Sequence, residues 1–424
     1  MAPGILSTRP TLHEQYLSHP SKKPETRSTP AADILLRQQA DIDWVPSFEK
    51  YQARASRRVK EGNLPTEVPQ GFPLSVEYAM RWTPEELRPS QYIYNLSDED
   101  VTEIDRALEH FKGLGFTKDD ISRETFPLPQ LQLTLDRVAQ GVHGGRGIAL
   151  LRGLDPRKYS FADNIILYTG VASYIGEKRG IQGHAGHILV HIKDVGDTVA
   201  PKSMRQAPYT NKAQPFHTDL GDVIAMYAID VAATGGRSNV ASAAQVYNDI
   251  ATTRPDLIHV LADKNWAFDK HEEDGSFYEH PILCHDAEAE RVSFCFSRRQ
   301  LTGSGLAPRP KTLPPLTDAQ AEALDAVHFT ANKHVLSIEL QRGDMTFVNN
   351  LGIFHAREAF TDDVDKSRHL VRMWIRNEKL AWKTPDNMDE IWDEIYGGKI
   401  EPVWYMDPNH TRAHVISRKD TCHA

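Results

Sequence analysis

From Gly180 onward, the sequence consists of short runs rich in β-branched and aromatic residues that are separated by Gly, Pro, Asn and Asp. Runs of this kind predict strands, and the residues between them predict tight turns. Because helices do not alternate with these strands, the pattern favours an antiparallel sandwich or jelly roll over a parallel doubly wound sheet. The predicted strands cover residues 187–192, 223–229, 239–243, 291–296, 335–340, 345–348 and 369–376.

Helices are predicted mainly in the first half of the chain. Ser97, with Asp100 three residues later, forms a capping-box signature, and apolar residues then recur at helical spacing. A buried strand is predicted over residues 147–154, so this half forms a helical cover over an opening strand. Further helices are predicted around residues 131–141 and 160–176, and two helical insertions in the second half cover 244–261 and begin at Thr317.

The first 95 residues differ from the rest of the chain. Residues 1–40 are rich in Pro, Ser, Lys and Thr and have little apolar periodicity, which predicts a flexible arm. Residues 41–95 contain aromatic residues at irregular spacing, which predicts an extension that packs on the body of the protein without a fold of its own. We therefore expect one mainly β domain with flanking helices over residues 96–424.

Composition narrows the expected partners and location. The 424 residues carry a formal net charge of −9 and give a pI of about 6.1, which argues against binding to nucleic acid. No apolar run approaches the roughly 20 residues that a membrane span requires. The three cysteines are scattered and form no CxxC pair, which is typical of a reducing compartment. These features predict a cytoplasmic protein that acts on a small molecule, and they leave a homo-oligomer open.

The run Phe216-His217-Thr218-Asp219 contains a candidate metal site. Alternate side chains of an extended strand leave the same face, so His217 and Asp219 would point in the same direction. One imidazole and one carboxylate supply two of the three ligands of a 2-His-1-carboxylate site, which typically holds non-haem Fe(II). Because the HxD tripeptide is common and also fits a surface turn, this hypothesis requires a third ligand.

His355 is the candidate for that third ligand. It follows the predicted strand over residues 345–348 and a break at Gly352. A single histidine in this position is usually a core or edge residue. The hypothesis that it binds a metal depends on the arginines that follow it.

Arginines recur at every fourth position in the last predicted strand. Arg368, Arg372 and Arg376 would share one face of this strand with Leu370 and Trp374. A row of charges is usually a solvated face, but arginines among bulky apolar residues suggest a pocket that receives anions. The planar guanidinium grips a carboxylate with two hydrogen bonds and stays charged when it is partly buried.

Three further features have roles that the residues alone leave open. A GG-x-S run that ends at Ser238 predicts a tight turn between strands and places a hydroxyl at the start of the next strand. Arg298 and Arg299 follow another predicted strand; either could reach a substrate anion, but a surface position is the favoured expectation. Trp374 is interpreted as a core residue.

Taken together, the HTD run, the GG-x-S run, the NNxxxxHAR run that contains His355 and the RHLVR run from Arg368 resemble a known family. In this combination and order they are similar to the TauD/TfdA-like Fe(II)/2-oxoglutarate dioxygenases, including the clavaminate-synthase-like members. The resemblance covers roughly residues 145–380 and implies a double-stranded β-helix, which is a cupin-like jelly roll. It also implies that His217, Asp219 and His355 are ligands of Fe(II).

The resemblance implies roles for the residues that bind the co-substrate. Arg368 would pair with the distal carboxylate of 2-oxoglutarate, and Ser238 stands where the family usually has a threonine on the same carboxylate. Arg372 matches a second arginine that meets an anionic group of the substrate in some members. Because the spacing from the distal histidine to Arg368 is longer than in the shortest members, the choice between the two arginines stays open. Phe216 and Arg237 depart from the tryptophan and the acidic residue that are common in the family.

The function that the resemblance implies is oxidation of an unactivated C–H bond of a small anionic metabolite, such as an amino acid. Fe(II), 2-oxoglutarate and O2 would be required, and succinate and CO2 would be released. Hydroxylation is the default outcome, while desaturation and oxidative ring closure would use the same residues. The segment over 182–211 is expected to cover the mouth of the barrel as a lid. The alternatives are a metal oxygenase of the same fold that uses no 2-oxoglutarate and a non-catalytic jelly-roll binding protein.

Overall fold

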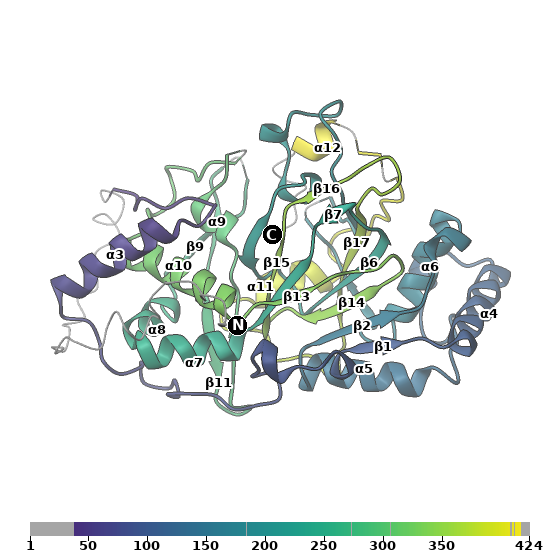
Figure 1. The fold of residues 1–424 in the computed structure, drawn as a ribbon, viewed down its shortest axis with the longest axis horizontal. Helices are drawn as coiled ribbons and strands as arrows, with labels where there is room; N and C mark the ends of the chain where they lie inside the picture. The colour runs from purple at the N-terminus through teal and green to yellow at the C-terminus, as the bar shows by residue number, and fades with distance from the viewer. Residues whose placement is uncertain are drawn as a thin grey trace, which may run out of the picture.

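Two sheets face each other across a central cavity that both of them line (Figure 1). In the main sheet the strand order is β1-β2-β14-β6-β17-β3, with β4 also paired to β17, and in the second sheet it is β13-β8-β15-β5. Apart from the parallel pair β1–β2, neighbouring strands in these sheets are antiparallel. This is the double-stranded β-helix, with helices at its sides, that the sequence predicts.

The computed structural model describes residues 38–183, 185–272, 274–305, 307–407, 409–410 and 412–416. Most of the predicted N-terminal arm, residues 1–37, lies outside the described residues. The strands of the main sheet are β1 (Ile93–Asn95), β2 (Ile148–Arg152), β3 (Lys178–Gly180), β4 (Val190–Ile192), β6 (Val223–Asp230), β14 (Met345–Asn349) and β17 (His369–Arg376). Those of the second sheet are β5 (Gln214–His217), β8 (Ser238–Ser242), β13 (Leu336–Ile338) and β15 (Ile353–Arg357). Three two-stranded sheets add β7 (Thr234–Gly235) with β16 (Phe360–Thr361), β9 (Ala267–Asp269) with β10 (Phe277–Glu279), and β11 (Leu283–Asp286) with β12 (Arg291–Phe294).

Alternation along the strands separates the core of the main sheet from its cavity face. Val223 and Ala225 of β6 and Met345 of β14 pack against the helices α4 (Asp98–Leu114), α5 (Gln132–Gly144) and α6 (Phe161–Ala172) in one buried cluster. Ile224 and Met226, the alternate residues of β6, line the cavity. The strand period that predicted this sheet therefore also determines which side chains reach the site.

The helix over Asp98–Leu114 begins and ends where the sequence predicts. The Asp100 N–H donates to Ser97 Oγ at 3.2 Å, and Asp100 Oδ2 accepts from the Ser97 N–H at 2.9 Å, which confirms the capping box. Gly115 adopts a left-handed conformation with φ of 67°, which a glycine reaches without strain and which ends the helix.

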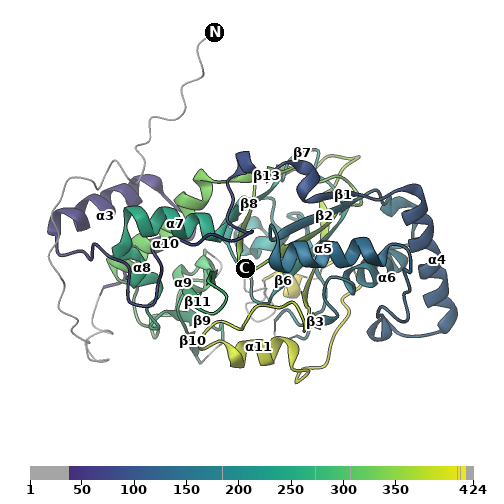
Figure 2. The ribbon, with the colours of Figure 1, turned by 90° about the horizontal axis from the view of Figure 1, so that it is seen from below.

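Further helices cover the second sheet and the lower face of the molecule. The predicted insertion over 244–261 is two helices rather than one, because Pro255 lacks an N–H group and begins a new helix after a break at Arg254. Seen from below in Figure 2, α3, α7, α8 and α10 lie at one end of the molecule and α4 and α6 at the other. Besides α4, α5 and α6, the described α-helices are α3 (Phe48–Glu61), α7 (Ala243–Thr253), α8 (Pro255–Leu261), α9 (Arg298–Thr302), α10 (Asp318–Lys333), α11 (Asp389–Tyr396) and α12 (Arg412–Ile416).

Four predicted strands are shorter in the structure, among them those over 147–154 and 291–296, which form Ile148–Arg152 and Arg291–Phe294. The segment predicted over 187–192 forms a strand only at Val190–Ile192, and the segment over 335–340 only at Leu336–Ile338. Among the helices of the described part of the chain, none has the length and apolar character needed to cross a membrane.

Helix α3 lies in the N-terminal extension and was not predicted, and its buried face combines charged and apolar side chains. Arg54 Nη1 donates to Asp325 Oδ2 of α10 at 2.7 Å, and both side chains are buried. Arg58 forms an ion pair with Glu322 on the same helix. Tyr51 and Ala55 are buried on the same face as Arg54, so α3 packs on α10 through apolar and charged side chains together.

We expect Arg54→Ala to lower the free energy of unfolding by about 3 kcal/mol, because it removes one partner of a buried ion pair. Arg57→Ala, on the same helix, removes an exposed pair with Asp318 and should cost less than about 1 kcal/mol. Urea unfolding of the two variants beside the wild type measures both values. Equal losses would show that the buried pair does not hold α3 on α10.

Candidate active site

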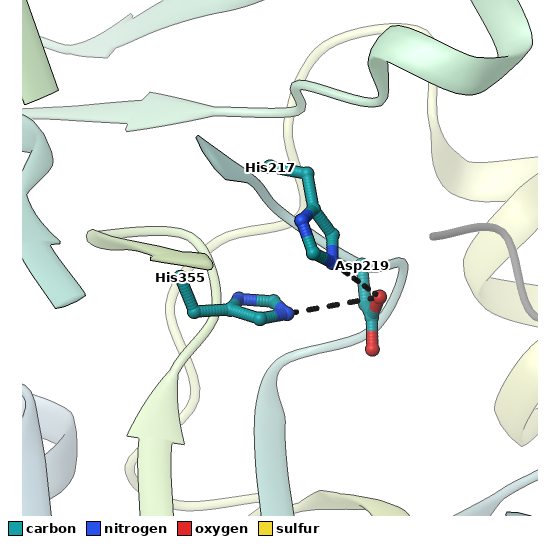
Figure 3. Close-up of side chains that lie close together, drawn as sticks. All are labelled: His217, Asp219 and His355. Carbon is teal, nitrogen blue, oxygen red and sulfur yellow. Dashed lines mark ion pairs between the residues drawn. The ribbon is translucent and has the colours of Figure 1, made fainter. Parts of the chain in front are cut away.

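The side chains of His217, Asp219 and His355 point toward one another (Figure 3), and the two histidines line the central cavity. Asp219 Oδ1 lies 3.8 Å from His217 Nε2 and 3.9 Å from His355 Nε2. One nitrogen or oxygen atom of each residue lies within 4.8 Å of those of the other two, and all three residues are buried. Three ligand atoms at this separation can hold one metal ion.

The two histidines come from neighbouring strands of the second sheet. His217 ends β5, and its backbone is paired with that of His355 in β15. His355 follows β14 and Gly352, as expected, and lies in β15, a strand that was not predicted. The expectation that Asp219 continues the strand of His217 is wrong: Thr218 leaves the β5–β15 ladder to bond with Phe296, and Asp219 lies in the loop after β5.

Asn350, in the turn between β14 and β15, shapes the loop that carries Asp219. Its Oδ1 accepts from the Asp219 N–H at 2.8 Å, and its Nδ2 donates to the carbonyls of Asp219 and Gly221 at 2.7 and 2.9 Å. The side chain is fully buried, so water does not compete for these bonds. The loop that carries Asp219 is thus held in place by the Asn350 side chain, although it lies outside the strand ladder.

The two oxygens of Asp219 have different surroundings. Oδ2 accepts hydrogen bonds from Arg372 Nη1 at 2.6 Å and from Trp374 Nε1 at 3.1 Å. Oδ1 is buried and has no hydrogen-bond partner among the described residues, and the same is true of His355 Nε2. Buried polar atoms are rarely left unpaired, so atoms of this kind that converge on one point fit a metal ion.

His217 is held in the tautomer that a metal requires. Its Nδ1 lies 2.8 Å from the carbonyl oxygen of Pro215 and donates to it, which leaves Nε2 with a lone pair. Burial lowers the pKa of His355 to about 3 and also lowers the pKa of His217, so both rings are neutral. Burial alone would raise the pKa of Asp219, but the charge of Arg372 and the hydrogen bond from Trp374 lower it below its usual value. Two neutral imidazoles and one carboxylate are a suitable ligand set for a divalent ion.

The cavity beside the triad has a cationic wall. Ser238, Arg357 and Arg368 line it, together with apolar side chains of both sheets. Burial lowers the pKa of Arg368 to about 10, so its guanidinium remains charged at neutral pH. Gly236 permits the approach of this arginine, because a Cβ atom there would lie 3.1 Å from Arg368 Cδ. The GG-x-S run therefore both turns the chain and leaves room for the side chain of Arg368.

Arg372 also lines the cavity, but the protein itself occupies much of its guanidinium. Nη1 donates to Asp219 as described, and Nε donates to Gln182 Oε1 at 2.8 Å. Its most direct role in the structure is to orient the carboxylate of Asp219. The sequence did not suggest this contact, because the two residues are 153 positions apart.

Trp374 and Arg357 are further residues of the site that the sequence interpretation missed. Trp374 is buried as predicted, yet its indole N–H also holds Asp219. Both residues could have been found from strand alternation, because Trp374 shares a face with Arg372 and Arg357 shares one with His355. Asn350 and Gln182 carried no such signal.

The expectation that Arg298 and Arg299 lie at the surface is wrong. Both side chains are buried, with 1% and 3% of their surface exposed. They line a smaller cavity together with Trp44 of the N-terminal extension. This second cavity shares His217 with the central cavity, so it reaches the triad from another side.

Comparison with known proteins agrees with this geometry. The family described as "Taurine catabolism dioxygenase TauD, TfdA family" matches residues 108–374. The "Taurine hydroxylase-like protein SAT17" of Stachybotrys chartarum is 34% identical over 342 residues, which are 78% of this chain and 88% of that protein. The "FR-33289 synthase" of Streptomyces rubellomurinus is 26% identical over 294 residues, which are 68% of this chain and 86% of that protein.

A solved structure shares the fold. A complex of asparagine oxygenase with Fe(II), 2S,3S-3-hydroxyasparagine and succinate superposes with a TM-score of 0.52 at 16% sequence identity. The match covers 67% of this chain and 93% of the oxygenase. At this level of identity the likeness concerns the fold.

We expect Trp374→Phe to weaken Fe(II) binding about ten-fold, because it removes one of the two bonds that hold Asp219 Oδ2. Trp382→Phe is the matched control, since Trp382 is buried and its indole donates to the His143 carbonyl at 2.7 Å, away from the triad. Anaerobic titration with Fe(II), followed by calorimetry, gives both dissociation constants. Equal affinities of the two variants would contradict the assigned role of the indole.

Proposed function

The chain belongs to the TauD/TfdA family of Fe(II)/2-oxoglutarate dioxygenases, and from this premise we propose that it oxidises a C–H bond of a small anionic metabolite. The enzyme class and the cofactors Fe(II) and 2-oxoglutarate follow from the family and from the His-Asp-His triad. The substrate class and the roles of single residues are our proposal.

We assign Fe(II) to His217 Nε2, His355 Nε2 and Asp219 Oδ1. The observation that carries this assignment is the pair of buried atoms, on Asp219 and His355, that face one point without a hydrogen-bond partner among the described residues. With O2, the bound cofactors supply the oxidising power: one oxygen atom enters the substrate and the other enters succinate, as CO2 leaves. Arg372 keeps Oδ2 engaged so that Oδ1 stays directed at the metal.

The co-substrate would lie in the central cavity. We assign its distal carboxylate to Arg368 and Ser238, because Arg372 is bonded to Asp219 and Gln182. The apolar residues of the cavity wall exclude water from the reacting atoms, which protects the substrate from side reactions. This choice of arginine agrees with the position of Gly236 beside Arg368.

The second cavity supports an anionic substrate. Arg298 and Arg299 line it beside His217, and buried guanidiniums attract carboxylates and sulfonates strongly. The relatives' names point to compounds of this size, since taurine and asparagine are both small acids with an amino group. An amino acid or a related sulfonic acid is therefore the substrate class that we propose.

The proposal is tested by a screen of small amino acids, sulfonates and carboxylates with the Fe(II)-loaded enzyme, 2-oxoglutarate and O2. Each acid is paired with its amide or ester, and succinate release is measured with the product mass. We expect stimulation by acids only, with a product that gains one oxygen or loses two hydrogens. His355→Ala is the inactive control, and equal stimulation by the neutral analogues would overturn the substrate class.

We further expect Arg299→Gln to raise the KM for the substrate about ten-fold or more, because a hydrogen bond to a charged group is lost. The dissociation constant of 2-oxoglutarate should not change. Arg298 is less suitable for this test, since it pairs with Asp325 at 2.8 Å and its loss would also destabilise the fold. Steady-state kinetics of Arg299→Gln and Arg299→Lys separate loss of the charge from loss of the guanidinium geometry. An unchanged substrate KM in both variants would reject this subsite.

A further inference from the structure

Arg357 is a second arginine in the wall of the central cavity. It lies two residues after His355 on β15, so the two side chains leave the same face of the strand. Its backbone is paired with that of Ser238, which also lines the cavity. The side chain is buried and lines the cavity together with Arg368.

The two guanidiniums lie near one aromatic ring. The Cζ atoms of Arg357 and Arg368 are each 5.2 Å from the centre of the Phe360 ring. Within the described part of the chain, neither forms a salt bridge with a carboxylate. Two buried like charges repel each other, and an anion between or beside them relieves that repulsion.

Each of the two side chains retains buried hydrogen-bond donors. Arg357 Nη2 donates to the carbonyls of Thr210 and Lys212 at 2.7 and 2.6 Å, which fixes the guanidinium against the loop that leads to β5. Arg357 Nε and Nη1 are buried and have no hydrogen-bond partner among the described residues, and Arg368 Nη1 is in the same situation. Donors of this kind mark a place where a ligand with oxygen acceptors fits.

We infer that Arg357 is a second guanidinium for the distal carboxylate of 2-oxoglutarate, next to Arg368. This inference rests on the proposed place of the co-substrate in the central cavity. A pocket with two cations discriminates more strongly than one with a single cation against 2-oxo acids that end in a methyl group. Arg357 thus contributes to the choice of co-substrate and does not only support the strand.

The experiment compares two 2-oxo acids that differ at the far end. The anaerobic Fe(II) enzyme is titrated with 2-oxoglutarate and with 2-oxopentanoate, and the visible charge-transfer band reports each dissociation constant. We expect Arg357→Gln to raise the dissociation constant of 2-oxoglutarate about ten-fold or more, because a charge-assisted hydrogen bond is lost. The dissociation constant of 2-oxopentanoate should stay within about two-fold of the wild-type value. Arg357→Lys, which keeps the charge, should restore part of the preference for 2-oxoglutarate.

Arg309→Gln is the matched control. Arg309 is partly buried and donates to backbone carbonyls, those of Ala267, Gln300 and Pro314, but it does not line the central cavity. An equal loss of affinity for both acids in Arg357→Gln, or no loss for either, would overturn the inference. Absence of the band in the wild type would instead reject the proposed co-substrate site, so the two failures can be told apart.

Discussion

The carboxylate of Asp219 is the point on which the site depends, because it joins both sheets. Its Oδ2 is bound by Arg372 and Trp374 of the main sheet, while its Oδ1 faces the histidines of the second sheet. A buried carboxylate is costly unless its charge is matched, and here one oxygen is neutralised by the protein and the other remains for a cation. Because the two sheets face each other, the main sheet binds one oxygen of Asp219 and the histidines of the second sheet face the other.

Because side chains alternate along each strand, the strands of the main sheet supply both the apolar core and one wall of the cavity. Residues of the main sheet alternate between the apolar cluster under α4–α6 and the cavity, so a shift of one residue would exchange the two sets. Arg372 could not then reach Asp219, and Val371 and Met373 would enter the cavity. The large cluster behind the sheet, with Val371 and Met373 fully buried, holds the register that the chemistry needs.

Features that depend on residues close together in the sequence could be predicted, whereas features that depend on distant residues could not. The jelly roll, the capped helix at Ser97 and the shared face of the arginines depend on periods and short motifs, and these were predictable. The loop position of Asp219 was not, because it depends on bonds from Asn350, which lies 131 residues away. Helix α3 was not predicted, and its attachment to α10 includes ion pairs between residues more than 260 positions apart. The burial of Arg298 was hidden for the same reason, since its partner Asp325 is distant in sequence.

Under the proposed function, the oxidation chemistry and the substrate preference depend on different parts of the chain. The triad and the central cavity use the strands that carry the family motifs, so those motifs are sufficient to identify the cofactors. The second cavity is built from α9, the segment before His217 and Trp44 of the N-terminal extension. Arg298 joins these parts, because it donates to the carbonyls of Asp43 and Trp44 and pairs with Asp325 of α10. A change in the extension therefore alters the wall of the second cavity without touching the metal ligands, and substrate preference can diverge while the oxidation chemistry is retained.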